Sequence, residues 1–172
     1  MSRVLEKSKL ITIRCTEEKD LDFVLKAEHH PNNSAYVAQW TREQHLESMS
    51  DSDILHLIVE DNTDSKPVGY IISTGFESPE RNIEFKRIVI TEKGKGFGRE
   101  ALRLIKKLSF EKFNAHRLWL DVRDHNLRAQ SLYKSEGFIQ EGLLRECVLY
   151  KGKFESIIIM SILENEYFKN KE

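Results

Sequence analysis

A strand pattern, a glycine-rich loop and an amphipathic helix follow one another directly between residues 82 and 113. Residues 82–91 are rich in β-branched and aromatic side chains and predict a strand. Residues 99–113 carry apolar side chains at helical spacing, which predicts a helix with one buried face. A further strand is predicted over 117–122. A strand, a helix and a strand in this order require a parallel pair of strands joined by a crossover.

The rest of the chain alternates between strand and helix patterns. Further strands are predicted over 10–13, 54–60, 67–76, 138–149 and 154–163, and further helices over 17–28, 41–49 and 126–137. Thr41 and Gln44 have the spacing of a capping box, and Gly137 suits a left-handed helix end. The order β-α-α-β-β-β-α-β-α-β-β predicts an α+β (mixed α/β) fold. Its central sheet is mixed but mostly antiparallel, has about seven strands, and carries helices on both faces.

Length and composition are those of one globular domain. The chain has 172 residues, of which 40% are hydrophobic and 32% are charged, enough apolar material for a core of its own. We expect residues 10–165 to form this domain, after a loose lead over 1–9 and before a polar tail over 166–172.

Charge and cysteine content argue against several classes of protein. The 27 basic and 28 acidic residues leave a net charge of -1, so no general attraction to nucleic acid is expected. Cys15 and Cys147 are too few for a disulfide framework or a zinc site and are predicted to be free thiols. The first residues lack an apolar signal segment, and the longest apolar run, 157–160, is too short to cross a membrane. We therefore expect a cytoplasmic protein that binds neither nucleic acid nor membranes.

The loop 93–98 reads Lys-Gly-Lys-Gly-Phe-Gly. Its three glycines let the backbone turn sharply and approach a ligand closely. The helix that follows begins with amides that have no internal partner, which favours an anion such as a pyrophosphate. Lys93, Lys95 and Arg99 add positive charge. The spacing fits neither the Walker loop nor the dinucleotide fingerprint, and a tight turn that binds nothing is the alternative.

A second motif lies beyond the helix that follows this loop. Residues 126–138 read Asn-Leu-Arg-Ala-Gln-Ser-Leu-Tyr-Lys-Ser-Glu-Gly-Phe. In this order, the two motifs resemble those of the GNAT superfamily of acetyltransferases, from Leu10 to Leu163. The resemblance is closest to the branch of ribosomal-protein N-terminal and spermidine acetyltransferases. Lys93 stands where the family has Gln or Arg, and the lead into the glycines is one residue shorter than in most members, which predicts a tighter turn.

The resemblance implies an N-acetyltransferase that moves an acetyl group from acetyl-CoA to a primary amine, either of a small molecule or of a peptide N-terminus. It also implies that the coenzyme A arm lies along the strand 82–91 and that Asn126 contacts this arm. Asn126 can cap the following helix at the same time. The cofactor-binding residues that it implies are Ile88, Val89, Ile90, Lys93, Gly94, Lys95, Gly96, Phe97, Gly98, Arg99, Asn126, Ala129 and Tyr133.

Tyr133 and Glu84 are the catalytic residues that the resemblance favours. A phenol stays protonated at neutral pH, so Tyr133 can act as the general acid that protonates the leaving thiolate. Glu84, near the start of its strand, is the candidate base. The alternatives are a core tyrosine and a solvated strand charge.

The resemblance places the acceptor amine between the loop after the first helix and the last hairpin. The expected acceptor residues are Asn33, Tyr36, Trp40, Glu84 and Glu146, with Asn32 and Tyr150 beside them. Tyr36 and Trp40 form either an aromatic wall or a packing pair, and packing is favoured. Glu28, Glu84 and Glu146 together would make the cleft acidic and suit a cationic amine.

Three further expectations complete this interpretation. The six histidines show no metal-ligand spacing, so no metal is expected. A homodimer is compatible with the family resemblance. The alternative function is a coenzyme A-binding sensor or partner subunit without catalysis, and the intact loop together with Tyr133 favours the enzyme.

Overall fold

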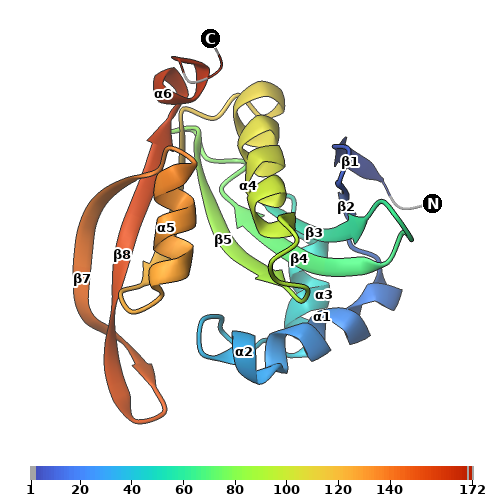
Figure 1. The fold of residues 1–172 in the computed structure, drawn as a ribbon, viewed down its shortest axis with the longest axis horizontal. Coiled ribbons are helices and arrows are strands. Elements are labelled where there is room, and N and C mark those ends of the chain that lie inside the picture. The colour runs from blue at the N-terminus through green and yellow to red at the C-terminus, as the bar shows by residue number, and fades with distance from the viewer. Residues whose placement is uncertain (1–2, 170, 172) are drawn as a thin grey trace.

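Eight strands form one sheet at the centre of the computed structural model, which describes residues 3–169 and 171 (Figure 1). The strands are β1 (Val4–Lys7), β2 (Ile11–Cys15), β3 (Ile54–Asp61), β4 (Pro67–Thr74), β5 (Asn82–Ile90), β6 (Arg117–Arg123), β7 (Ile139–Tyr150) and β8 (Lys153–Leu163). Their order across the sheet is β1-β2-β3-β4-β5-β6-β8-β7. β5 and β6 are parallel and all other neighbours are antiparallel, which confirms the predicted mixed sheet.

Helices cover both faces of the sheet. They are η1 (Glu18–Asp20), α1 (Leu21–His29), α2 (Pro31–Ser34), α3 (Arg42–Ser50), α4 (Phe97–Lys107), the π-helical η2 (Leu108–Lys112), α5 (Leu127–Ser135) and α6 (Glu164–Lys169). On one face, Ala101 and Ile105 of α4 belong to the larger apolar cluster, together with Ile13 and Ile71 of the sheet. On the other face Val24 of α1 belongs to a smaller cluster. The two clusters are the two sides of the core.

The ends of the chain are more regular than the sequence suggested. Within the expected loose lead, β1 pairs with β2, and the buried Glu6 is held by Lys107 and Lys112. Within the expected tail, α6 extends the last strand and buries Tyr167. Residues 1–2, 170 and 172 of these two segments lie outside the described residues. The sheet therefore has eight strands, whereas the sequence predicted about seven.

The predicted helix signals are confirmed at three positions. The Thr41 hydroxyl accepts from the Gln44 amide, and the Gln44 side chain accepts from the Thr41 amide. Asn126 caps α5 by accepting from the Ala129 amide at 3.3 Å. Gly137, after α5, has a φ of 92°, which is the left-handed conformation that glycine favours. α4 starts at Phe97, two residues before the predicted start.

β5 and β6 diverge along their length, and this leaves a gap in the sheet beside α4. They pair only over 82–84 and 117–119, although both strands continue. Directly after the paired part, Phe85 and Lys86 both lie opposite Ser73 of β4, which makes a β-bulge. Beyond the bulge, the backbone groups of β5 that face β6 have no strand partner. The fold therefore offers a free strand edge to a ligand.

No helix in residues 3–169 is long and apolar enough to cross a membrane.

Candidate active site

A long cleft of about 890 Å³ lies in the opening beside β5. It runs from the end of β5 along the glycine loop to α4 and α5, and we call it the long cleft. Most of the residues expected to bind the cofactor line it. They are Ile88, Val89, Ile90, Lys93, Gly94, Gly96, Phe97, Gly98, Arg99, Asn126, Ala129 and Tyr133. The structure thus brings together two motifs that are well separated in the sequence.

The glycine loop has the geometry of an anion site. Gly94 and Gly96 have φ values of 85° and 84°, a region that side chains rarely adopt. Gly96 is the N-cap of α4 and no side chain caps this helix. The first amides of α4, including those of Phe97 and Gly98, therefore have neither an intrahelical nor a side-chain partner. Together with the helix dipole, they suit a phosphate group.

The positive charges around the loop are only partly free. Lys95 is paired with Glu92 and does not line the long cleft. Arg99 lines it but is held by Glu136 at 2.6 Å. Lys93 lines it too, and its pKa is lowered by burial and by the neighbouring charge of Arg128. Among the described residues Lys93 has no acidic partner, only a 3.5 Å contact with the Asn32 carbonyl, so its charge remains available to a phosphate.

A smaller cavity of about 250 Å³ continues from the long cleft, and we call it the side cavity. It lies where β5 and β6 diverge, between Glu84 and Asp121, and residues 36–38 in the loop after α2 form another of its walls. Tyr36, Val37, Ile88, Asn126 and Tyr133 line both the side cavity and the long cleft. A group bound in one therefore meets a group bound in the other at these side chains.

Tyr133 is buried at this junction. Its side chain packs near Phe138, with ring centroids 6.0 Å apart, and only 8% of the residue is exposed. Burial, with a smaller contribution from the negative charge of Asp121, raises the pKa of Tyr133 to about 12. The phenol is therefore protonated throughout the neutral range, as a proton donor has to be.

Two carboxylates border the side cavity. Glu84 accepts from the Thr74 hydroxyl at 3.2 Å and lies 3.8 Å from the Lys86 ammonium. Asp121 keeps an exposed surface, but partial desolvation by the cavity walls and the nearby charge of Glu84 raise its pKa, although Arg123 and Lys86 act in the opposite direction. Glu84, which has polar partners, and Asp121, whose pKa is raised, therefore both border the cavity that Tyr133 lines.

The expected acceptor residues separate into different environments. Tyr36 lines the side cavity and faces His125, with ring centroids 5.7 Å apart. Asn33 borders the long cleft, but its amide donates to the Ala27 carbonyl at the end of α1. Trp40 lines neither cavity and turns inward. Tyr36 and Trp40 are therefore neither a wall nor a packing pair.

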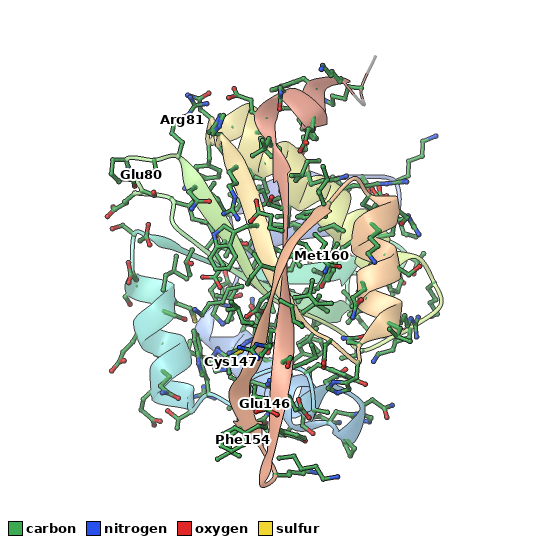
Figure 2. All side chains as sticks on the ribbon, turned by 90° about the vertical axis from the view of Figure 1, so that its left-hand side faces the viewer. Glu80, Arg81, Glu146, Cys147, Phe154 and Met160 are labelled. Atoms are coloured by element: carbon green, nitrogen blue, oxygen red, sulfur yellow. The ribbon has the colours of Figure 1, made fainter. Side chains whose placement is uncertain are left out.

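Glu146 also lies away from both cavities. It sits in an irregular part of β7, with a φ of 50°, where the pairing with β8 shifts between Leu144 and Val148. Figure 2 shows Glu146 and Cys147 low on the β7–β8 hairpin, well below Met160. Glu146 is therefore not one of the charged residues that line the side cavity.

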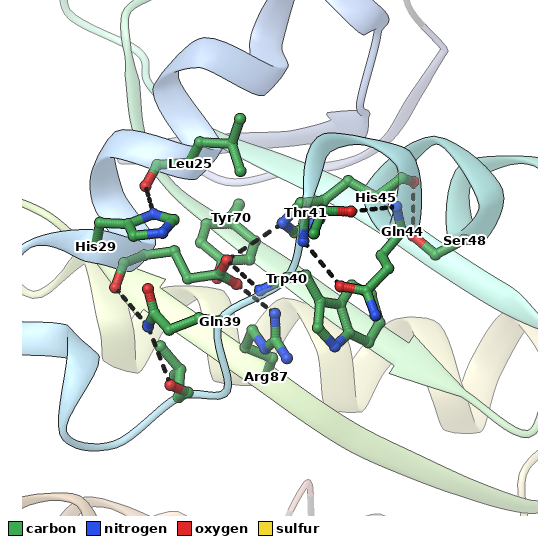
Figure 3. Close-up of polar contacts among 12 residues, drawn as sticks. Leu25, His29, Gln39, Trp40, Thr41, Gln44, His45, Ser48, Tyr70 and Arg87 are labelled. Atoms are coloured by element: carbon green, nitrogen blue, oxygen red, sulfur yellow. Dashed lines mark hydrogen bonds and ion pairs between the residues drawn. The ribbon is translucent and has the colours of Figure 1, made fainter. Parts of the chain in front are cut away.

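Glu28 is the centre of a buried polar network, not a cleft residue. Its carboxylate is fully buried and accepts from the Trp40 amide at 2.9 Å, the Tyr70 hydroxyl at 2.8 Å, and Arg87. His45 lies 3.4 Å away. Burial opposes the charged form, but these bonds and the charge of Arg87 outweigh it and lower the pKa of Glu28. Figure 3 shows Trp40, Tyr70 and Arg87 gathered close together in this network. The expectation that Glu28 makes the cleft acidic is wrong.

Comparison with known proteins agrees with this geometry. The model of the acetyltransferase (GNAT) family matches residues 17–138. The chain belongs to the GNAT family. It is 28% identical to the spermidine N(1)-acetyltransferase of Vibrio cholerae, over 94% of this chain and 98% of that protein. A crystal structure of the Vibrio cholerae spermidine N-acetyltransferase in complex with CoA and spermine superimposes with a TM-score of 0.85, at 26% identity, over 94% of this chain and 99% of that one.

A dodecameric structure of the Vibrio cholerae enzyme superimposes with a TM-score of 0.82, at 26% identity, over 96% of this chain and 100% of that one. The family membership and these relatives establish that this GNAT protein is an acetyl-CoA-dependent N-acetyltransferase. The catalytic interpretation is therefore confirmed over that of a sensor without catalysis.

Two charged residues that line the cavities of this GNAT chain, Asp121 and Arg128, were not among the predicted site residues. Asp121 lies in a strand whose alternation of apolar and polar residues was visible in the sequence. That alternation does not show where the neighbouring strand β5 separates from β6 and leaves Asp121 facing a cavity. Arg128 lines the long cleft from the first turn of α5, and the signal available for it was its place inside the second motif.

Proposed function

We propose that this enzyme acetylates a primary amine by direct attack of the amine on the acetyl-CoA thioester, with Tyr133 as the general acid. The observation that carries the proposal is the position of Tyr133, whose side chain lines both the long cleft and the side cavity. A thioester held in the long cleft and an amine held in the side cavity meet beside a phenol that keeps its proton. Proximity and a positioned proton donor are what this reaction needs.

The same proposal assigns the long cleft to coenzyme A. Its donors are the free edge of β5, which supplies the amides of Ile88 or Ile90, and the uncapped start of α4. Neither Gly94 nor Gly96 has an atom within 3.4 Å of where a Cβ would be, so the loop surface is open to a phosphate. Asn126 and Ala129 form the wall on the side of α5.

The acceptor is proposed to be a polyamine. The support is the likeness to enzymes named for spermidine, over nearly the full length of both chains. A peptide N-terminus is the second candidate, because the side cavity is open and a terminal amine carries the same reacting group. Removal of a proton from either ammonium needs a base, and Glu84 and Asp121 are the carboxylates that border the cavity. That Glu84 is the base stays the prediction from the sequence, and Asp121 is the alternative that the cavity offers.

A thiol-release assay with acetyl-CoA and an amine panel tests the proposal. The panel contains spermidine, spermine, a short diamine, a monoamine and a peptide with a free N-terminus. We expect release of coenzyme A with at least one amine, and greatest efficiency with the polyamines. Release with the peptide alone would contradict the polyamine acceptor, and release with none of these amines would contradict the proposed function.

Self-association is a further proposal. The residues Ile139, Leu143, Leu144 and Leu149 of the edge strand β7, with Phe154 of β8, are 48–66% exposed, and exposed apolar side chains on an edge strand favour contact with another chain. Figure 2 shows Phe154 near the lower end of the hairpin. Light scattering on the purified protein should give a mass above that of one chain. A monomer at micromolar concentration would contradict it.

The cytoplasmic location expected from the sequence also stays a prediction.

A further inference from the structure

The parallel register of β5 and β6 places Asp121 beside the acceptor amine's expected position. Glu84 of β5 lies opposite Trp119 of β6, and Asp121 is two residues further along β6. Its neighbours Leu120 and Val122 point into the core. Because side chains alternate along a strand, Asp121 points away from that core, and it lines the side cavity.

Most charges of the side cavity are already matched by a partner. Arg87 is paired with the buried Glu28. Arg123 lies 3.6 Å from Glu155.

The third cation, Lys86, lies 3.8 Å from Glu84. Glu84 also accepts a hydrogen bond from Thr74. The Asp121 carboxylate, by contrast, forms neither a hydrogen bond nor an ion pair within 4 Å among the described residues. It is the carboxylate of the cavity whose oxygens are free to receive a proton.

The surroundings of Asp121 also suit proton transfer. Asp121 keeps an exposed surface at the cavity, where an acceptor can reach it. Its partial desolvation by the cavity walls and the charge of Glu84 raise its pKa, and Lys86 and Arg123 only partly oppose this. The negative charge of Asp121 in turn helps to raise the pKa of Tyr133. A carboxylate with a raised pKa is a better base than one in water, and Glu84 thus makes Asp121 more basic.

We propose that Asp121 is the general base that takes a proton from the incoming ammonium, with Glu84 acting through it. The inference rests on the proposed function. In the step, one N–H proton of the ammonium passes to an Asp121 carboxylate oxygen. The freed nitrogen lone pair forms the C–N bond to the acetyl carbon, and the C–S bond breaks.

The leaving sulfur takes the phenol proton of Tyr133. A second proton from the amine nitrogen, which the new amide has to lose, restores that phenol. Asp121 then releases its proton to solvent. The sum is one amide, one thiol and one proton for each ammonium acetylated.

The test compares Asp121→Asn with Asp124→Asn, using an accepted primary amine and its β-fluorinated analogue. Asp124 is a matched acid just beyond β6 that lines neither cavity. The fluorinated ammonium is more acidic, so more of it is already deprotonated. We expect Asp121→Asn to lower kcat/KM by about 10²-fold with the ordinary amine and by a clearly smaller factor with the analogue. Asp124→Asn should resemble the wild type.

Acetyl-CoA affinity, measured by calorimetry, should be the same in all three proteins, which separates a lost base from a damaged fold. Asp121→Glu should restore part of the activity. Equal losses with both amines, or no loss with either, would overturn the assignment while the proposed function stands. If the wild type acetylates no amine, both the proposed function and this inference are wrong.

Discussion

The Arg87 guanidinium carbon lies 4.4 Å from the centre of the Trp40 ring. The same guanidinium is paired with the fully buried Glu28, and Glu28 also accepts from the Trp40 amide. β5, which forms one wall of the long cleft, is thereby tied to the segment between α2 and α3. That segment carries Tyr36 and Val37, which line both cavities. The buried network therefore fixes the position of β5 relative to this segment, and with it the spacing of two walls of the site.

Arg87→Met should therefore destabilise the protein strongly. Removal of the cation leaves the Glu28 carboxylate buried without its charge partner, which costs about 3–5 kcal/mol. The double variant with Glu28→Gln should lose less than the sum of the single losses, because it buries no unpaired charge. Urea denaturation measures the free energies of unfolding. Arg42→Met is the matched control, because its pair with Asp22 is exposed and worth less than about 1 kcal/mol. A loss no larger than that of the control would contradict the role of the network.

Acid should weaken the fold through His56. This buried side chain contacts His45 at 2.9 Å and the Thr16 hydroxyl at 2.8 Å. Burial, the neighbouring His45 and Arg87 lower the pKa of His56 to about 3. The unfolded chain binds a proton near pH 6.5 and the folded one does not, so the stability due to this residue falls as the pH drops from 6.5 towards 3.

The expected slope from His56 is about 1.4 kcal/mol for each pH unit within that window. Urea denaturation between pH 7.5 and 4.5 measures it. His56→Gln should remove this part of the slope, and the exposed His29→Gln should keep it. Glu28 adds a separate loss, because its pKa is lowered from the ordinary value of 4.5. The stability that this gives is present above pH 4.5 and disappears as the pH falls further. An unchanged slope in His56→Gln would show that another group causes it.

Local signals in the sequence were sufficient for much of this fold. The Thr41–Gln44 capping box, the Asn126 cap and the glycine after α5 each depend on a few neighbouring residues, and each is present. β1 was missed because a short strand is stabilised by its partner β2 and by Lys107 and Lys112 of a remote helix. Such a strand leaves little pattern of its own.

The site was harder to predict where it depends on pairing between strands. The bulge at Phe85 and Lys86 exists only relative to Ser73. It turns Val89 towards the smaller cluster and lets Ile88 and Ile90 pack against the larger one. The alternation of apolar and polar residues within β5 does not by itself predict this change of face. Trp40 was misplaced for the same reason, since its inward position depends on Arg87, which is remote in the sequence.

The glycine loop should bind acetyl-CoA through its backbone, and a pair of alanine variants separates binding from strain. Gly94 and Gly152 both have positive φ, 85° and 77°, and in both an added Cβ would meet no atom within 4 Å. Each substitution by Ala should cost about 1 kcal/mol of folding stability. Gly152 lies in the β7–β8 turn, outside both cavities. Only Gly94→Ala should raise KM for acetyl-CoA, by about tenfold, in steady-state kinetics. Similar KM values in the two variants would argue against phosphate binding by this loop.

Tyr133→Phe should abolish most turnover without harming the fold. The hydroxyl makes no hydrogen bond to the described residues, so the variant loses little packing or bonding, whereas loss of the general acid should lower kcat by about 10²-fold or more. Tyr167→Phe is the matched control. Tyr167 is equally buried, at 7% against 8% exposed, but its hydroxyl donates to Glu111 at 2.6 Å. This control should lose about 1 kcal/mol of stability and keep its kcat. Thiol release and thermal denaturation on both variants measure the two effects, and a Tyr133→Phe enzyme with normal kcat would remove Tyr133 from the mechanism.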